Sequence, residues 1–172
     1  MKICMIGSGY VGLVSGACFS DLGNTVTCVD INKEIVEKLK KGIIPIYEPG
    51  LQELVERNSK KKRLLFSTDI SNSIKKSDII FICVGTPTKN NKADLKYVFN
   101  VTKSIKSNLN RYKIIVTKST VPVTTGDIIE KILNSKKNQN KFDVVSNPEF
   151  LREGEAIRDF QFPDRVVVGT SS

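Results

Sequence analysis

Three closely spaced glycines and one aspartate are the residues of this sequence whose spacing most clearly indicates a chemical role. Residues 7–12 read GSGYVG, and Asp30 lies eighteen residues after the last glycine of that motif. Gly7 would permit a tight strand-to-helix turn, Gly9 would let the main chain approach a ligand, and Gly12 would let the helix pack closely on the strand. Because main-chain N–H groups at the start of a helix attract anions, the motif predicts a binding site for a diphosphate.

Asp30 stands at the end of the second apolar run of the chain. Its carboxylate could accept hydrogen bonds from the ribose of adenosine, and its charge would repel a 2′-phosphate. Together with the glycines, it therefore favours NAD over NADP as the cofactor. A plainer interpretation stays open, in which the glycines make only a tight turn and Asp30 caps the next helix.

Two further apolar runs are followed by hydroxyl side chains and prolines. Thr86 and Pro87 come after the fourth run, and Ser119, Thr120 and Pro122 come after the fifth. Ligands of open α/β sheets bind at the carboxyl ends of the strands, so the threonines are predicted to touch the cofactor or to hold a water. The alternative is that they cap a helix or form turns.

The segment SNPEFLREGEAIRDF at residues 146–160 carries the last chemically useful side chains. Asn147 and Pro148 end the sixth apolar run. Glu149 and Glu153 are four residues apart, which on a helical turn would place both carboxylates on one face. One could act as a general base and the other could contact a sugar or a ribose. The alternative is a capped surface helix with solvated acids.

The elements that must position these residues alternate along the chain between short apolar runs and helical patterns. Strands are expected at residues 2–6, 25–29, 64–66, 79–84, 113–117, 143–145 and 165–169. Helices are expected at residues 11–22, 33–41, 51–58, 95–108 and 124–133. Nearly continuous apolar strands that alternate with helices are typical of a parallel sheet covered on both faces. The predicted fold is therefore α/β, a doubly wound, Rossmann-type parallel sheet.

The composition limits the classes of protein to consider. The 172 residues fit one domain, and their content of 40% hydrophobic and 26% charged residues is ordinary for a globular protein. No apolar run has the length of a membrane span, and the glycines interrupt the first run in a way that a signal peptide does not show. We therefore expect a cytoplasmic protein without a membrane partner.

The net charge of +9 raises the possibility of a nucleic-acid partner. The basic residues are scattered, however, and the densest run, at residues 59–63, is expected to be a solvated loop, so we predict no nucleic-acid binding. The four cysteines form no CxxC pair and are expected to be buried free thiols. The absence of histidine excludes imidazole bases and most zinc sites, and no metal is predicted.

Four motifs, GSGYVGL, VGTPT, KSTVPVTTG and SNPEFLREGEAI, make the chain resemble the UDP-glucose/GDP-mannose dehydrogenase family over essentially its whole length. Members of this family oxidise a sugar alcohol of a nucleotide sugar to an acid. The resemblance implies that the chain is the NAD-binding domain of an enzyme that converts UDP-glucose to UDP-glucuronate with two NAD and one water. A cysteine thiol captures the intermediate aldehyde in this family, and water hydrolyses the resulting thioester.

The resemblance also assigns roles to individual residues. The cofactor contacts that it implies are Gly7, Gly9, Tyr10, Val11, Gly12, Asp30, Thr86, Thr120 and Glu153. The substrate side would be lined by Glu149, Phe150, Leu151, Arg152 and Glu153. Thr120 would also help to hold the catalytic water, and Glu149 would act as an acid or base near the sugar or help to activate that water.

The chain departs from the family pattern in two ways. A basic residue often lies five positions after the ribose-binding aspartate, but this chain has Ile35 there, and Lys33 could substitute. The family's nucleophilic cysteine, active-site lysine, dimerisation helix and second nucleotide-sugar domain match nothing in residues 1–172. We therefore expect a truncated chain that is inactive alone and whose full-length form is a homodimer. The alternatives are another nucleotide sugar, such as GDP-mannose or a UDP-N-acetyl-hexosamine, or a non-catalytic NAD-binding remnant.

Overall fold

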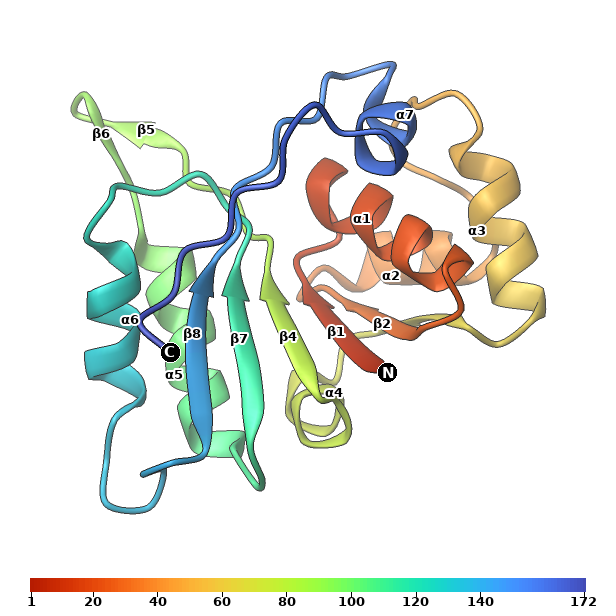
Figure 1. Cartoon of the computed structure of the whole chain (residues 1–172). Coiled ribbons are helices and arrows are strands. Elements are labelled where there is room, and N and C mark those ends of the chain that lie inside the picture. Colours follow the sequence, from red (N-terminus) through yellow and green to blue (C-terminus); the bar gives the residue numbers. More distant parts are fainter.

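The centre of the molecule is a six-stranded parallel sheet, seen in a computed structural model that describes all residues from 1 to 172. Its strands are β1 (Lys2–Ile6), β2 (Thr25–Val29), β3 (Leu64–Ser67), β4 (Ile79–Ile82), β7 (Lys113–Thr117) and β8 (Phe142–Ser146). Their order across the sheet is β3-β2-β1-β4-β7-β8, so the chain builds outward first on one side of β1 and then on the other (Figure 1). The strand order therefore reverses between β1 and β4, which is where ligands bind in such sheets.

Helices cover both faces of this sheet. One face is covered by α1 (Tyr10–Asp21), α2 (Lys33–Lys40), α3 (Leu51–Lys60) and α7 (Ala156–Gln161). The other face is covered by α4 (Ile70–Lys76), α5 (Lys96–Asn108) and α6 (Thr125–Leu133). A small hairpin of β5 (Thr88–Lys89) and β6 (Lys92–Ala93) projects from the sheet between β4 and α5 (Figure 1).

The first strand illustrates why the apolar runs of this sequence form a sheet that is buried on both sides. Ile3 and Met5 belong to the apolar core under α1, whereas Cys4 and Ile6 belong to the core under α4 and α5. Successive side chains of a strand point to opposite faces, so a strand covered on both sides needs an unbroken apolar run. The predicted doubly wound α/β fold is confirmed.

Several predicted elements need correction. Residues 165–169 do not form a strand of the sheet, because only Gly169 pairs, through one antiparallel bridge to Ser146, and Val166 and Val168 are exposed. The single bridge is antiparallel and joins Gly169 to the last residue of β8, so the segment does not add a strand to the parallel sheet. The structure also contains α4, α7 and the β5–β6 hairpin, none of which the apolar pattern predicted.

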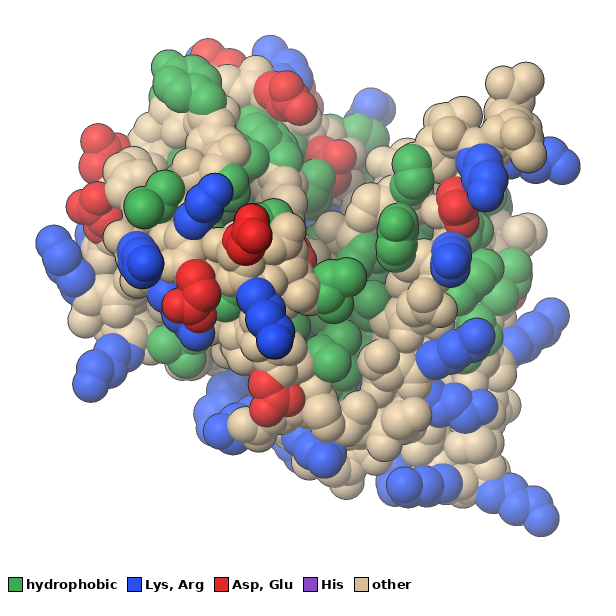
Figure 2. Space-filling model, turned by 180° about the vertical axis from the view of Figure 1, so that it is seen from behind, with side chains coloured by type: hydrophobic (Ala, Val, Ile, Leu, Met, Phe, Trp, Pro, Cys, Tyr) green, Lys and Arg blue, Asp and Glu red, His purple; other side chains and the backbone are tan.

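None of the helices combines the length and the hydropathy that a membrane crossing requires. Basic side chains are spread across the face shown in Figure 2 and do not gather in one patch.

Candidate dinucleotide site

The turn between β1 and α1 can be built only with glycine at two of its three motif positions. Gly7 has a φ of +104°, and its N–H donates to the carbonyl of Val29 at 2.8 Å. A Cβ at Gly7 would lie 2.7 Å from the carbonyl oxygen of Cys83, and a Cβ at Gly12 would lie 1.9 Å from the carbonyl oxygen of Gly7. These two glycines therefore let the turn and the helix pack against the ends of β1, β2 and β4.

Gly9 has no such structural reason to be glycine. Its φ of −74° suits any residue, and a Cβ at this position would meet no atom within 4 Å. No side chain caps the first turn of α1, and that turn contains no acidic residue. The free N–H groups and the positive end of the helix dipole therefore face open space next to a bare main chain, which is the arrangement that holds a diphosphate. The residues present fit a dinucleotide.

Asp30 lies directly beside this turn. Its carboxylate accepts hydrogen bonds from the main-chain N–H groups of Ser8 and Asn32, both at 2.9 Å. The cap of α2 is the side chain of Asn32, which accepts from the N–H groups of Glu34 and Ile35 at 2.9 and 3.3 Å. The interpretation of Asp30 as a helix cap is therefore wrong, and its carboxylate is held at the glycine turn, where an adenosine ribose would lie in this fold.

The carboxyl ends of β4 and β7 meet next to the same turn. The hydroxyl of Thr86 donates to the carbonyl of Thr120 at 2.8 Å, and the hydroxyl of Ser119 donates to the carbonyl of Val84 at 2.7 Å. Thr86 and Thr120 are thus brought together, with Thr86 half-buried and Thr120 exposed. Thr120 does not cap α6, because no side chain caps that helix.

The predicted helical face with Glu149 and Glu153 does not exist. Residues 147–155 run as an irregular loop, and α7 begins only at Ala156. The Glu149 carboxylate accepts from the N–H of Leu151 at 2.6 Å, and Gly154 has a φ of +88°. A side chain that bonds its own loop competes with helix formation, and a left-handed glycine interrupts it.

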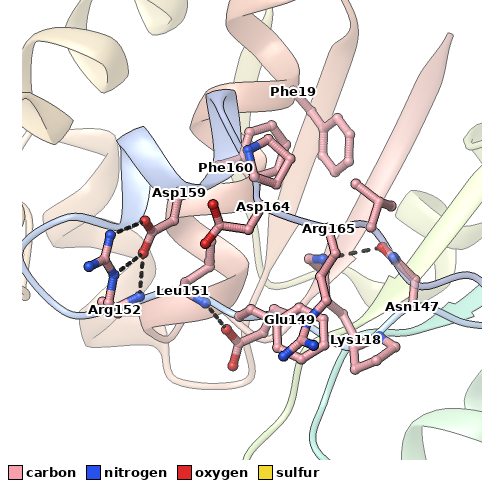
Figure 3. Close-up of a pocket in the computed structure, with 14 residues that line it drawn as sticks. Phe19, Lys118, Asn147, Glu149, Leu151, Arg152, Asp159, Phe160, Asp164 and Arg165 are labelled. Atoms are coloured by element: carbon pink, nitrogen blue, oxygen red, sulfur yellow. Dashed lines mark hydrogen bonds and ion pairs between the residues drawn. The ribbon is translucent and has the colours of Figure 1, made fainter.

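A cavity of about 740 Å³ adjoins this loop (Figure 3). The residues that line it include Lys118, Asn147, Glu149, Phe150, Leu151, Arg152, Asp159 and Arg165. Four of the five predicted substrate residues are among them, and Glu153 is not. No residue of the glycine turn lines this cavity. The loop at 147–155 therefore contributes most of its residues to the cavity, whereas the glycine turn contributes none.

Two of the charged side chains around this cavity form an ion pair, and a third packs on an aromatic ring. The guanidinium of Arg152 donates to both carboxylate oxygens of Asp159, at 2.6 and 3.0 Å, and these bonds lower the pKa of Asp159 to about 2. The guanidinium of Arg165 lies 4.7 Å from the ring centroid of Phe150, a cation–π contact. Asp159 thus holds Arg152 through the guanidinium and also through the main-chain N–H, which donates to Oδ2 at 2.9 Å.

Lys118 is a residue of the cavity that the motifs did not single out. It follows β7 directly, is only 7% exposed, and donates from Nζ to the Oδ1 atom of Asn147 at 3.2 Å. Burial lowers the pKa of its ammonium group, although Cys83 and Glu149 act in the opposite direction. The only sign in the sequence that Lys118 lies in the cavity was its place in the KSTVP motif at a strand end.

A doubly wound sheet with a glycine-rich turn after its first strand and a carboxylate after its second defines a Rossmann-type dinucleotide-binding domain. Residues 1–172 match the UDP-glucose/GDP-mannose dehydrogenase family, NAD binding domain, and the chain belongs to this family.

Individual relatives agree with this assignment. The chain is 54% identical over 173 residues to UDP-glucose 6-dehydrogenase TuaD of Bacillus subtilis (strain 168), covering 99% of this chain and 38% of the relative. It is 52% identical over 171 residues to a UDP-glucose 6-dehydrogenase of Rhizobium meliloti (strain 1021), covering 98% of this chain and 39% of the relative. The chain thus spans about two fifths of the length of these relatives.

Solved structures give the same result. A UDP-glucose dehydrogenase from Pyrobaculum islandicum superposes with a TM-score of 0.94 at 39% identity, covering 99% of this chain and 41% of that one. A GDP-mannose dehydrogenase from Pseudomonas aeruginosa superposes with a TM-score of 0.93 at 36% identity, with the same coverage of 99% and 41%.

Proposed function

We propose that this chain binds NAD for a nucleotide-sugar dehydrogenase that oxidises UDP-glucose to UDP-glucuronate. The observation that carries the cofactor assignment is the uncapped start of α1 beside Gly9 and the carboxylate of Asp30. The substrate assignment is supported by relatives that are 54% and 52% identical and are named UDP-glucose 6-dehydrogenases. NAD accepts a hydride from the alcohol carbon when it is bound.

Different residues of this chain bind different parts of the dinucleotide. The main-chain N–H groups of residues 9–12 hold the diphosphate, and Asp30 accepts from the adenosine ribose. Thr86, Thr120 and Glu153 contact the remaining part of the dinucleotide. In the proposed reaction, Thr120 also helps to hold a water.

Residues 149–152 face the sugar across the cavity of about 740 Å³. The Glu149 carboxylate is the group that takes or returns a proton there. It lines the cavity, and it is close enough to Lys118 to raise the pKa of that ammonium group. Phe150, Leu151 and Arg152 provide the walls of the substrate site.

The chain alone is expected to bind NAD without completing the oxidation to the acid. The reaction of the family needs a cysteine thiolate, and all four cysteines here are buried. The same proposal includes three inferences from the resemblance. The nucleophile is a cysteine other than these four, the full-length enzyme is a homodimer, and its location is cytoplasmic.

Calorimetry with the 172-residue chain tests the cofactor assignment. NAD should bind more tightly than NADP. Asp30→Ala should weaken NAD binding and should reduce the difference in affinity between NAD and NADP. Absence of NAD binding, or tighter binding of NADP, would contradict the proposal.

A second candidate substrate is GDP-mannose, supported by the TM-score of 0.93 to a GDP-mannose dehydrogenase. Turnover of a panel of nucleotide sugars by the complete polypeptide decides between the two. Preferred turnover of GDP-mannose over UDP-glucose would replace the first assignment with the second.

A further inference from the structure

Glu48 is a buried carboxylate in a stretch of chain that has neither helix nor strand. It lies between α2 and α3 and is only 7% exposed. Its Oε2 atom accepts from the hydroxyl of Tyr10 and from the N–H of Gly154, the latter at 2.8 Å. Its Oε1 atom accepts from the N–H of Ile157 at 3.3 Å.

The three donors to Glu48 come from two segments that lie at or next to predicted cofactor contacts. Tyr10 belongs to the glycine motif and opens α1, whereas Gly154 directly follows Glu153. The N–H of Gly154 also donates to the Tyr10 hydroxyl oxygen at 3.1 Å, so the three groups form a closed set of hydrogen bonds.

The charge of Glu48 is stabilised by these hydrogen bonds alone, since no lysine or arginine forms an ion pair with it. Burial and the bond to Glu48 raise the pKa of the Tyr10 hydroxyl to about 12, so Tyr10 remains a donor at neutral pH. A buried carboxylate that depends on three donors requires all three to stay in place.

The loop around Glu48 is itself held against α7. Gly50 has a φ of +81°, which glycine adopts without strain, and a Cβ there would lie 3.7 Å from the Cδ1 atom of Ile157. The loop therefore bridges the start of α1 and the start of α7, with Glu48 between them.

We propose that Glu48 is a positioning residue that holds Glu153 and the loop at 147–155 against the first turn of α1, so that NAD affinity depends on Glu48 although this residue does not touch NAD. The inference rests on the proposed function, because it takes Glu153 as an NAD contact. In this proposal Glu48 and Tyr10 together hold the irregular loop that also lines the cavity, through the N–H of Gly154.

The test measures NAD affinity of the 172-residue chain by calorimetry and amide hydrogen exchange without ligand. Glu48→Ala should weaken NAD binding about tenfold, because the loop that carries Glu153 loses its anchor. Glu153→Ala should weaken it to a similar extent. Adding Glu48→Ala to Glu153→Ala should then cause little further loss, since both act through one contact.

Amide hydrogen exchange without NAD measures directly whether Glu48 holds the loop at 147–155 in place. In Glu48→Ala the N–H groups of Gly154 and Ile157 should exchange faster than in the wild type, whereas protection in β1 and β4 should change little. Glu48→Gln keeps acceptor oxygen and should retain part of the affinity. Tyr10→Phe removes one donor only, and provides the same test if Glu48→Ala does not fold.

A destabilised control separates positioning from general loss of stability. Ile105→Val shortens a buried side chain of α5 on the opposite face and should leave NAD affinity unchanged. Wild-type affinity in folded Glu48→Ala, or additive losses in the double variant, would overturn the positioning role while leaving the proposed function intact. Failure of the wild type to bind NAD would instead overturn the proposed function and this inference with it, even if Gly154 and Ile157 lose protection in the variant.

Discussion

At the scale of single residues, the three motif glycines do different jobs, and the structure separates them. A Cβ would collide with main-chain oxygens at Gly7 and Gly12 but would meet nothing at Gly9. The first two glycines are required to form the turn, and Gly9 is required only if something else comes close to it. The motif therefore contains two glycines that the fold requires and one that it does not, so a substitution at Gly9 can test ligand binding with little effect on folding.

Gly9→Ala is expected to leave stability nearly unchanged and to abolish most NAD binding. Alanine is a poorer N-cap residue than glycine, which destabilises the fold, but it also lowers the entropy of the unfolded chain, which stabilises the fold. Because these two effects nearly cancel, the free energy of unfolding should change by no more than about 0.5 kcal/mol. The added methyl group occupies the space where the diphosphate must approach, and affinity should fall at least about tenfold. Calorimetry and urea unfolding measure the two quantities.

The control for Gly9→Ala is Gly126→Ala in α6, where a Cβ would meet its nearest atom at 3.7 Å. It should keep full NAD affinity. Equal NAD affinity in Gly9→Ala and wild type would show that the open space at Gly9 is not where the diphosphate binds.

Gly12→Ala is expected to act in the opposite way. Its Cβ would lie 1.9 Å from the carbonyl oxygen of Gly7, so α1 would have to move away from the sheet. The free energy of unfolding should fall by about 3 kcal/mol, and urea unfolding measures the loss. A midpoint equal to that of the wild type would mean that the close packing of α1 on the turn is wrong.

At the scale of elements, ion pairs and hydrogen bonds hold together strand ends that lie far apart in sequence. Asp78, just before β4, accepts from the N–H of Lys2 at 3.0 Å and pairs with Arg111 at 2.6 Å. The N–H of Lys2 and then the guanidinium of Arg111 hold the pKa of the Asp78 carboxyl below its usual value. This carboxylate thus joins the amino ends of β1 and β4 to the loop before β7.

Asp78→Asn is expected to remove part of the acid sensitivity of the fold. Because the pKa of Asp78 is lower in the folded chain than the unfolded value of about 3.9, its stabilising effect is complete above that value. The effect disappears as the pH falls through the lower, folded pKa. The variant should therefore be less stable than the wild type at pH 6, and the two should converge below pH about 3.

Thermal unfolding of both proteins between pH 2.5 and 7 measures this convergence. The gap should be small at every pH, since the carboxylate is partly exposed and water screens it. A gap of constant size over the whole range would show that ionisation of Asp78 does not contribute.

The same scale explains which elements could be predicted from sequence. Buried strands and long helices were predicted, since an unbroken apolar run or a helical period identifies them locally. The hairpin of β5 and β6 was missed because each strand has two residues, although Asn90 and Asn91 both have positive φ, at 51° and 58°, as the tightest hairpin turns require. The short α4, ISNSIKK, has too few apolar residues to show a period.

The candidate site was predictable where it depends on a single turn and not where it depends on distant contacts. The glycine turn and Asp30 follow from spacing within one βαβ unit. The helical face with Glu149 and Glu153 was wrong because a local bond from Leu151 and the left-handed Gly154 decide the backbone. Glu48 gave no local signal at all, because its partners lie 38 to 109 residues away.

At the scale of the whole molecule, the chain buries every thiol it has. Cys4, Cys18, Cys28 and Cys83 are all free and all buried. Burial raises the pKa of Cys4, Cys18 and Cys83 to about 12 and raises that of Cys28 as well. The thiolate, which is the reactive form of cysteine, is therefore nearly absent at neutral pH.

The folded chain is consequently expected to react with thiol reagents only on unfolding. At pH 7.5 an aromatic disulfide should find no rapidly reacting thiol in the native protein and four in urea. Addition of UDP-glucose and NAD should then produce no thioester on this chain, because no thiolate is available to capture an aldehyde. Cys83 is the strictest test, since it is 8% exposed and Lys118 lowers its pKa against the larger effect of burial. Rapid modification that disappears in Cys83→Ser would show that one thiol is reactive after all, and would reopen the question of whether the chain can supply its own nucleophile.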